Sequence, residues 1–210
     1  QTSGVLALAR SADAAARIAE AFRGEEGMAS KTYYAVVWPV PRDTFGCIDR
    51  AIEKVLGSQG QPDRVKIVES GGKRAVTHYE VVSKSPDGGG LLRLTPTTGR
   101  THQLRVHCAD ALKCSIVGDW KYAVGHKAVR AKLGAKPSKL CLHAHTLKLT
   151  FRSGDGRGGE TTVEASAPIP EHMWAVMKKL GIPCPEALAG EQLQASEAAQ
   201  AEEEALEGAD

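Results

Sequence analysis

The sequence predicts an α+β domain built on one large, mixed and mostly antiparallel β-sheet flanked by a few helices. Segments of alternating apolar and polar residues recur along the chain, at 64–69, 75–83 and 140–151. Glycine-rich stretches at 70–72 and 153–159 follow two of these segments and suit the turns of antiparallel strands. Helical spacing of apolar residues is confined to a few short stretches, so strands dominate the prediction.

The first sixty residues are predicted to hold two strands, one helix and one undecided segment. Residues 4–9 suit a buried strand, and Ser11 suits the N-cap of an alanine-rich helix that ends near Arg23. Residues 31–38 are aromatic and β-branched, which favours a strand. Residues 45–56 fit helical spacing. The inner stripe of the first helix is predicted to comprise Ala15, Ile18, Ala19 and Phe22.

The rest of the chain alternates strands with short helices. A strand is predicted at 91–94, and Thr101 can cap a helix that runs towards residue 112. A loop at 116–122 and a short helix at 128–133 follow. The strand at 140–151 should pair with 161–165, and Pro170 opens a last helix that Gly181 ends.

The charge is distributed unevenly along the chain. The chain holds 27 Lys and Arg against 25 Asp and Glu, but residues 186–210 contain eight of the acidic residues and no basic one. The remaining body therefore carries 27 basic and 17 acidic residues, a net charge of +10. Such a body suits a polyanionic partner. No apolar run is long enough to cross a bilayer, so no membrane association is expected.

The five cysteines predict reduced thiols rather than a disulfide framework. Their number is odd and their spacing is scattered, which indicates an intracellular, reducing compartment. Two groups of His and Cys residues could be drawn as zinc ligands, but neither has a recognised spacing. We therefore expect no metal. The members of these groups are His102, His107, Cys108 and Cys114, and His143 with His145.

The most informative run of the chain is 96–107, Pro-Thr-Thr-Gly-Arg-Thr-His-Gln-Leu-Arg-Val-His. Within the predicted helix, His102 and Arg105 are three residues apart and share one face. A guanidinium held on a packed helix can orient a carboxylate or phosphate with two parallel hydrogen bonds. From the residues alone, a surface arginine beside a core helix is an equally good interpretation.

This run resembles a signature motif of the RluA-type RNA pseudouridine synthases, Gly-Arg-x-His-Gln-Leu/Ile-Arg-Val-His. Residues 1–6 resemble the end of the family's catalytic motif, Arg-Leu-Asp-x-x-Thr-Ser-Gly, and 31–35 resemble its Lys-x-Tyr-x-Ala motif. All the similar motifs occur in the family's order and cover residues 1–180. The other matches are Gly72-Lys73-Arg74-Ala75 with Thr77 and Tyr79, Gly118-Asp119 with Tyr122, and Leu142-His143-Ala144 with Leu147.

The resemblance implies a catalytic fold with a long bent sheet, a cleft across its middle and a short strand at 46–49. It implies an enzyme, an isomerase that converts specific uridines of RNA to pseudouridine without any cofactor. The target base must leave the stack to be attacked. The family's nucleophile is an aspartate three residues before the threonine matched by Thr2. This places it two residues before Gln1, outside the sequence.

The resemblance also implies roles for individual residues. Arg105 matches the arginine that pairs with the catalytic aspartate, and Tyr33 matches the tyrosine that stacks on the target base and is a candidate base for the C5 proton. Thr2, Ser3 and Gly4, with Gly99 and Gln103, would support the motifs. The candidate RNA contacts are Arg100, His102, Lys31, Lys73, Arg74 and Lys121.

We therefore expect a pseudouridine synthase domain at 1–183 and an acidic, disordered or partly helical tail at 184–210. Ribosomal RNA is the expected substrate, with proteins of pre-ribosomal particles as further candidate partners. Both cytoplasm and mitochondrion fit the expected compartment. The alternative is a catalytically inactive RNA-binding or ribosome-assembly factor of the same fold, and the residue two places before Gln1 would distinguish the two. The sequence does not indicate an oligomeric state.

Overall fold

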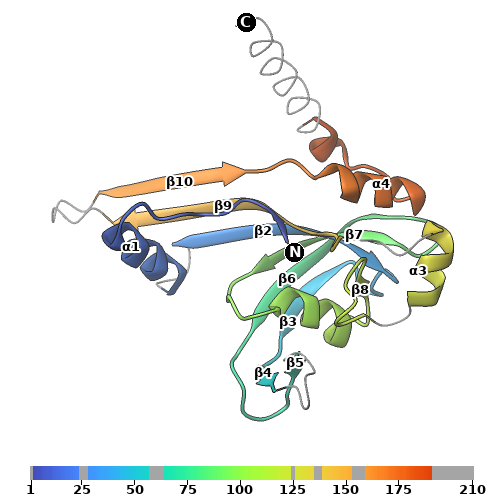
Figure 1. Cartoon of the computed structure of the whole chain (residues 1–210), viewed down its shortest axis with the longest axis horizontal. Helices are drawn as coiled ribbons and strands as arrows, with labels where there is room; N and C mark the ends of the chain where they lie inside the picture. The colour runs from blue at the N-terminus through green and yellow to red at the C-terminus, as the bar shows by residue number, and fades with distance from the viewer. Residues whose placement is uncertain are drawn as a thin grey trace, which may run out of the picture.

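The computed structural model describes residues 2–23, 28–56, 64–123, 126–134, 139–152 and 159–190. One eight-stranded sheet forms the centre of the molecule (Figure 1). Its main path runs β1-β9-β2-β7-β6-β3, with β10 beside β9 and β8 beside β2. The β1–β9 pair is parallel and the other pairs are antiparallel. The predicted α+β class and mixed sheet are therefore confirmed.

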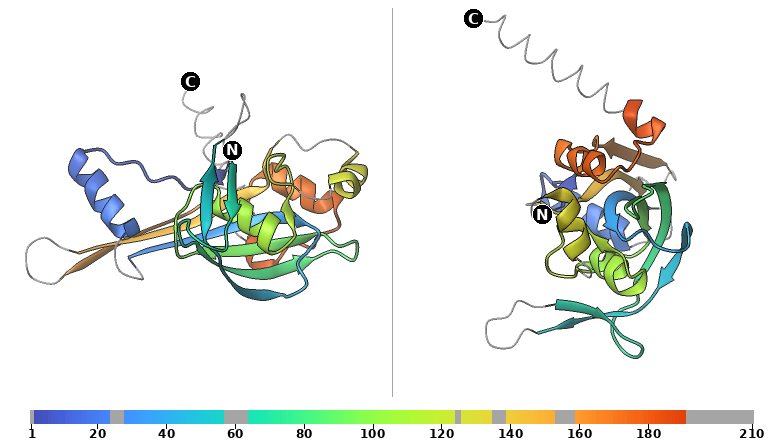
Figure 2. Two further views of the ribbon diagram at one scale, coloured as in Figure 1. Left: turned by 90° about the horizontal axis from the view of Figure 1, so that it is seen from below. Right: turned by 90° about the vertical axis from the view of Figure 1, so that its right-hand side faces the viewer.

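Most strands lie where side-chain alternation predicts them. They are β2 (Ala29–Trp38), β6 (Val76–Lys84), β7 (Gly90–Pro96), β9 (Leu142–Arg152) and β10 (Glu160–Ser166). The predicted pairing of 140–151 with 161–165 is correct, because Leu149 lies opposite Val163 in the antiparallel β9–β10 pair. Figure 2 shows that the sheet curves, with β2, β9 and β10 forming an arm beside α1 that leads away from the other strands.

The undecided segment 45–56 forms two strands. β3 (Phe45–Asp49) pairs with β6 at the edge of the large sheet, so the strand implied by the family is confirmed. β4 (Ile52–Val55) pairs with β5 (Arg64–Ile67) in a separate two-stranded sheet. The short β8 (Ser115–Ile116) lies in the segment predicted as a loop and pairs with β2. Pairing with distant strands thus determines the secondary structure of segments that the local spacing of apolar residues does not assign.

The N-terminal prediction is partly wrong. β1 comprises only Ser3–Gly4, and Leu6 and Leu8 beyond it are 75% and 78% exposed rather than buried in a strand. Helix α1 (Ala12–Arg23) begins as predicted, because the backbone N–H of Ala14 donates to Ser11 Oγ at 3.1 Å.

The inner stripe of α1 is rotated from the prediction. Ala21 is buried and Ala14, Ile18 and Ala19 are half-buried, whereas Ala15 is exposed and Phe22 is 43% exposed. The helix covers only one end of the sheet, beside β9 (Figure 1), and most of its residues remain exposed.

Two short helical segments cover the middle of the sheet. α2 (Gln103–Val106) continues directly into the π-helical segment η1 (His107–Ala111). The buried side chains of Leu104 and Cys108 belong to the main core, together with Tyr79 of β6. Cys114 closes this segment, because its backbone N–H donates to Cys108 O at 2.9 Å.

Two more helices cover the other end of the sheet. α3 (His126–Leu133) and α4 (Glu171–Lys179) contribute Val129, Met173 and Met177 to the main core. α4 begins after Pro170, as predicted. Residues 186–190 are helical and Leu188 is buried, whereas the rest of the expected tail lies outside the described residues. None of the helices within the described ranges has the length and apolarity needed to span a membrane.

A β-bulge interrupts the β2–β9 pair beside the site. Thr32 lies opposite Thr146, whereas the next residue, Tyr33, lies opposite Ala144. His145 is therefore an extra residue on β9, and its ring contacts Tyr34 edge-on at 5.0 Å between centroids. Tyr34 is buried on the face opposite Tyr33, as the alternation of strand residues predicts.

Candidate active site

Four segments that are distant in the sequence meet around one pocket of about 180 Å³. Thr2 reaches it from the N-terminus, Tyr33 from β2, the 96–100 loop from the end of β7, and Arg105 from α2. The resemblance implied that Thr2, Tyr33 and Arg105 act together, and the fold brings all three to one pocket. The other lining residues are Lys31, Pro96, Thr98, Gly99, Arg100, His102, Gln103, Leu104 and Leu142.

The start of the chain is fixed against β9. Ser3 lies opposite His143, and its hydroxyl contacts His143 Nδ1 at 3.0 Å. Gly4 has φ +110°, and a Cβ there would lie 2.0 Å from Ala144 O, so a larger residue cannot occupy this position. These contacts direct Thr2 towards the pocket and fix the direction from which any preceding residue approaches.

Tyr33 is held at the pocket by the middle of the sheet. It lies opposite Leu94 of β7 on one side and Ala144 of β9 on the other. Burial raises the pKa of the Tyr33 phenol above its ordinary value. The side chain is therefore neutral near pH 7, which suits an aromatic surface better than a general base.

Gln103 organises the loop between β7 and α2. Its side-chain Oε1 lies 2.7 Å from Thr98 Oγ1 and accepts from the Arg100 N–H at 3.0 Å. Its amide Nε2 donates to Val76 O and Thr77 Oγ1 at 2.9 and 3.0 Å. Since both ends of the buried amide are bonded, Gln103 fixes the loop between β7 and α2 against β6.

The predicted N-cap at Thr101 is wrong. The N-cap of α2 is His102, which has φ 55° and makes no side-chain capping bond. Thr101 is exposed, and the Gln103 side chain already accepts from the Arg100 N–H of the loop and donates to Val76 O of β6. The left-handed backbone at His102 turns its ring to the pocket wall that Arg105 also lines.

Arg105 is anchored by a residue that the sequence analysis did not assign to the site. Its Nε and Nη2 donate to the two carboxylate oxygens of Asp119, each at 2.7 Å. The side chains are only 11% and 2% exposed. Asp119 Oδ1 also accepts from the backbone N–H groups of Lys121 and Tyr122 at 3.0 and 3.1 Å. The Asp119 hydrogen bonds raise the pKa of Arg105, so the guanidinium stays charged and fixed in direction.

Tyr122 connects this ion pair to its surroundings. Its ring centroid is 5.0 Å from Arg105 Cζ, and its hydroxyl accepts from the Val65 N–H at 3.0 Å and contacts His102 Nδ1 at 2.8 Å. Burial, followed by the charges of Arg105 and Lys121, lowers the pKa of His102. Nδ1 of a neutral His102 can accept a hydrogen bond from the Tyr122 hydroxyl. Asp119 and Tyr122 occur in a recognised motif, but only the fold reveals their partners.

The residues predicted to contact RNA line the pocket or the cavities next to it, with the exception of Arg74. Arg100, His102 and Lys31 line it, and Lys121 lines an adjoining cavity of about 360 Å³ together with Thr2 and Arg105. Lys73 lines a third cavity of about 560 Å³, which shares Gly99 and Arg100 with the first pocket.

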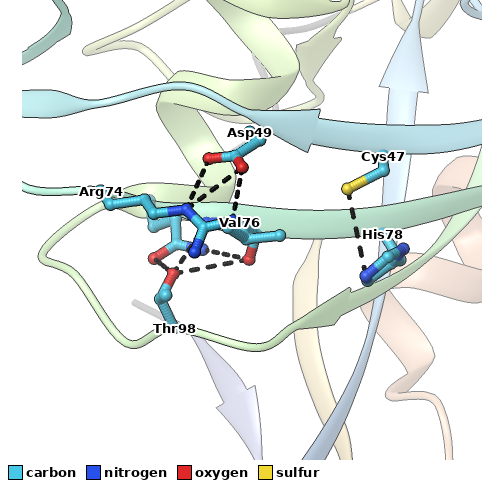
Figure 3. Close-up of polar contacts among 7 residues, drawn as sticks. Cys47, Asp49, Arg74, Val76, His78 and Thr98 are labelled. Atoms are coloured by element: carbon cyan, nitrogen blue, oxygen red, sulfur yellow. Dashed lines mark hydrogen bonds and ion pairs between the residues drawn. The ribbon is translucent and has the colours of Figure 1, made fainter.

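Arg74 lies apart from these cavities, at the exposed edge of the sheet (Figure 3). Its Nε and Nη2 donate to both oxygens of Asp49 on β3. The side chains are 74% and 47% exposed. Cys47 and His78 form a second exposed cross-strand contact at 4.0 Å nearby (Figure 3).

The histidines and cysteines considered for zinc have other contacts. His107 Nδ1 lies 2.9 Å from Thr77 Oγ1, and His143 Nε2 lies 2.9 Å from Ala167 O. Within the described ranges, no three His, Cys, Asp or Glu side chains form a group that could hold a metal ion. All five cysteines are free thiols, and Cys108, Cys114 and Cys141 are buried.

Comparison with known proteins shows the same family along most of the chain. Residues 1–110 match the family described as RNA pseudouridylate synthase. An uncharacterized RNA pseudouridine synthase of Zymomonas mobilis is 38% identical over 170 residues, covering 81% of this chain and 69% of that protein. The ribosomal large subunit pseudouridine synthase C of Rickettsia felis is 34% identical, covering 80% of this chain and 50% of that protein.

The fold gives a matching result. The solved structure of human RNA Pseudouridylate Synthase Domain Containing 4 superimposes with a TM-score of 0.60 at 26% identity, covering 84% of this chain and 70% of that one. Other relatives, from Arabidopsis thaliana and Xenopus tropicalis, are named mitochondrial. The chain spans between half and about two thirds of the two bacterial relatives. By its sequence and its fold, the chain belongs to the RNA pseudouridylate synthase family.

Proposed function

We propose that this chain forms the catalytic domain of an enzyme that isomerises uridine to pseudouridine in RNA. The observation that supports this most directly is the meeting of Thr2, Tyr33 and Arg105 at one pocket. The pocket is small, open on one side and surrounded by cationic side chains, which suits a single base swung out of an RNA strand. The cations are Lys31, Arg100 and Arg105 at the pocket and Lys121 beside it.

Arg105 would hold the nucleophilic carboxylate. In the reaction the carboxylate attacks C1′ of the target nucleotide as the N1–C1′ bond breaks, and the bonding electron pair leaves with the uracil. After the uracil rotates, C5 bonds to C1′ and displaces the carboxylate. C5 then loses its proton and N1 gains one, so that the product is an isomer of the substrate. Asp119 uses Nε and Nη2 of Arg105, so within the described residues Nη1 is left to bind a second carboxylate. An aspartate two residues before Gln1 would approach along the line of Thr2. The adjacent guanidinium would keep that aspartate ionised and aimed.

Tyr33 would provide the surface on which the flipped uracil rests. Its raised pKa favours a stacking role over direct removal of the C5 proton, because the phenolate is rare at neutral pH. Arg100 and Lys31 would bind phosphates of the same strand, since both cations line the pocket that holds the base.

Ribosomal RNA is the substrate that we propose, since the Rickettsia felis relative is named for the large ribosomal subunit. The free thiols fit a reducing compartment, and the mitochondrial names of other relatives add the mitochondrion to the bacterial cytoplasm as a proposed location.

The test is pseudouridine formation by the chain preceded by its natural upstream residues. Ribosomal RNA made without pseudouridine is incubated with the protein, and modified uridines are mapped by their reaction with carbodiimide. We expect one or a few uridines to be converted. Arg105→Met, or replacement of the upstream aspartate by Ala, should nearly abolish conversion while RNA binding remains. Tyr33→Phe keeps the stacking ring and should retain conversion, so a loss in this variant would show that the phenol hydroxyl takes part in the reaction. If the upstream residue is not an aspartate and no uridine is converted, the assembly-factor alternative replaces the enzyme.

A further inference from the structure

Phe22 is an aromatic residue whose observed place differs from its sequence-based expectation. It was predicted in the inner stripe of α1, yet 43% of it is exposed. It lies beside Lys31, whose ammonium is 5.3 Å from the centroid of the Phe22 ring. An exposed aromatic ring with a cation beside it is the pairing that binds a base and a phosphate in single-stranded nucleic acid.

Lys31 connects this ring to the pocket. It lines the pocket together with Tyr33, two residues further along β2, and its Nζ would lie 3.7 Å from a Cβ placed on Gly99 of the pocket loop. Lys31 and Tyr33 line the same pocket, and Phe22 contacts the Lys31 ammonium. A strand whose target base lies against Tyr33 and whose phosphate binds Lys31 would therefore pass beside the Phe22 ring.

The charge of Lys31 favours an anion at this place. The side chain is half-buried, and burial lowers its pKa from the ordinary value. Among the described residues no carboxylate lies within ion-pairing distance of it. Since the Lys31 ammonium is partly desolvated and meets no carboxylate in the described part of the chain, it would gain from a phosphate supplied by a ligand.

We propose that Phe22 and Lys31 bind the nucleotide next to the target uridine, with its base stacked on the free face of the Phe22 ring and its phosphate bound by Lys31. This proposal rests on the proposed function, because it places the target base in the Tyr33 pocket. It adds a positioning element that selects for an unpaired nucleotide beside the target. A base that is stacked in a helix would not reach the ring.

The first experiment measures binding of a labelled oligocytidine RNA with one central uridine, by fluorescence anisotropy. Phe22→Ala should weaken binding about 10-fold, since stacking of one base on an aromatic side chain contributes on the order of 1–3 kcal/mol. Phe22→Leu keeps an apolar side chain without the ring and should bind as weakly. Phe22→Trp should bind as well as the natural protein. Phe45→Ala removes a more exposed phenylalanine on the edge strand β3 and serves as the matched control.

The second experiment identifies the stacked nucleotide. An abasic residue placed on the 5′ or the 3′ side of the uridine should weaken binding to the natural protein about 10-fold on one side only. The same abasic residue should cost the Phe22→Ala variant nothing further, because the two changes remove one contact. Lys31→Gln should lower the slope of log affinity against log salt by about 0.7, the loss of one phosphate contact on a single strand.

The outcomes separate this proposal from the proposed function. If the natural protein forms pseudouridine but the Phe22 variants bind like it, or the abasic penalty is the same in both, the stacking proposal is wrong and the enzyme assignment stands. If the natural protein neither binds the RNA nor forms pseudouridine, both proposals fail. Circular dichroism melting of each variant shows whether a loss of binding comes from unfolding of α1.

Discussion

Two Arg–Asp pairs in this molecule have the same geometry and opposite surroundings. Arg105–Asp119 and Arg74–Asp49 each use Nε and Nη2 on both carboxylate oxygens. The first pair is 11% and 2% exposed and lies beside the pocket, whereas the second is 74% and 47% exposed at the β3 edge (Figure 3). Bidentate contact alone therefore does not mark a functional site, since burial decides how much each pair contributes.

The largest expected difference between the pairs is catalytic. Asp119→Asn removes the charge that orients Arg105, and we expect kcat for pseudouridine formation to fall about 100-fold, because small misplacements of a catalytic group have this effect. KM should change little, since Asp119 does not itself face the RNA.

The matched change at the exposed pair, Asp49→Asn, should leave kcat within error of the natural protein. An equal loss of kcat in the two variants would show that Asp119 has only a structural role and that the two pairs do not differ in function.

The second difference is in stability. Asp119→Ala leaves a charged guanidinium buried without its partner, and breaking a buried pair in this way costs about 3–5 kcal/mol of unfolding free energy. Urea unfolding of Asp119→Ala and Asp49→Ala measures the contrast, and the exposed variant should unfold close to the natural midpoint. A small effect at Asp119 would mean that water reaches Arg105 readily.

The third difference is the pH range in which the buried region around Arg105 and the exposed region around Arg74 lose stability. Burial lowers the pKa of His107, two residues beyond Arg105, below the ordinary value near 6.5. The unfolded chain then binds the proton more readily, so stability falls as the pH drops below about 6.5 and continues to fall through the folded pKa. The unfolding free energy of His107→Gln should depend less steeply on pH between about 6.5 and 5. An unchanged slope would assign the loss to other groups.

The smallest difference is the response of the exposed pair to acid and salt. The hydrogen bond from Arg74 lowers the pKa of Asp49, so this pair stabilises the fold above pH ~4 and loses its effect as the pH falls through the folded pKa. A double-mutant cycle on Arg74 and Asp49 should give a small coupling at low salt and none in 1 M NaCl. The Arg105–Asp119 coupling should persist in the same salt. Loss of both coupling energies in 1 M NaCl would show that the two pairs are equally accessible to solvent and salt.

The comparison also explains how far the sequence predicts the structure. β2, β9 and β10 were predicted because alternation and a glycine-rich turn report local pairing. Residues 45–56 were left undecided because Ile48 and Ile52 fit helical spacing until β6 and β5 pair with them. The motif residues Thr2, Tyr33 and Arg105 meet as the resemblance implied.

Other parts of the site could not be predicted because they depend on long-range contacts. The ion pair with Asp119 joins residues 14 positions apart, and the motif that contains Asp119 does not by itself identify Arg105 as its partner. Thr101 looks like an N-cap until the Gln103 side chain is found to bond the loop. Phe22 looks like a core residue until the helix is placed at the end of the sheet, where only one side is covered.

The extra residue in β9, His145, sets a rule for changes in chain length. Tyr33 and Leu142 line the pocket on one side of the bulge, whereas Lys31 lies opposite Leu147 on the other side. Loss of His145 would leave Tyr33 opposite Ala144 and Thr32 opposite Thr146 in regular pairing, so the residues on both sides would keep their faces. Loss of one residue from β2 would instead invert every position on one side of the deletion, because neighbouring strand residues alternate between faces. Deletion of the His145 codon should therefore be tolerated far better than deletion of a single codon in β2.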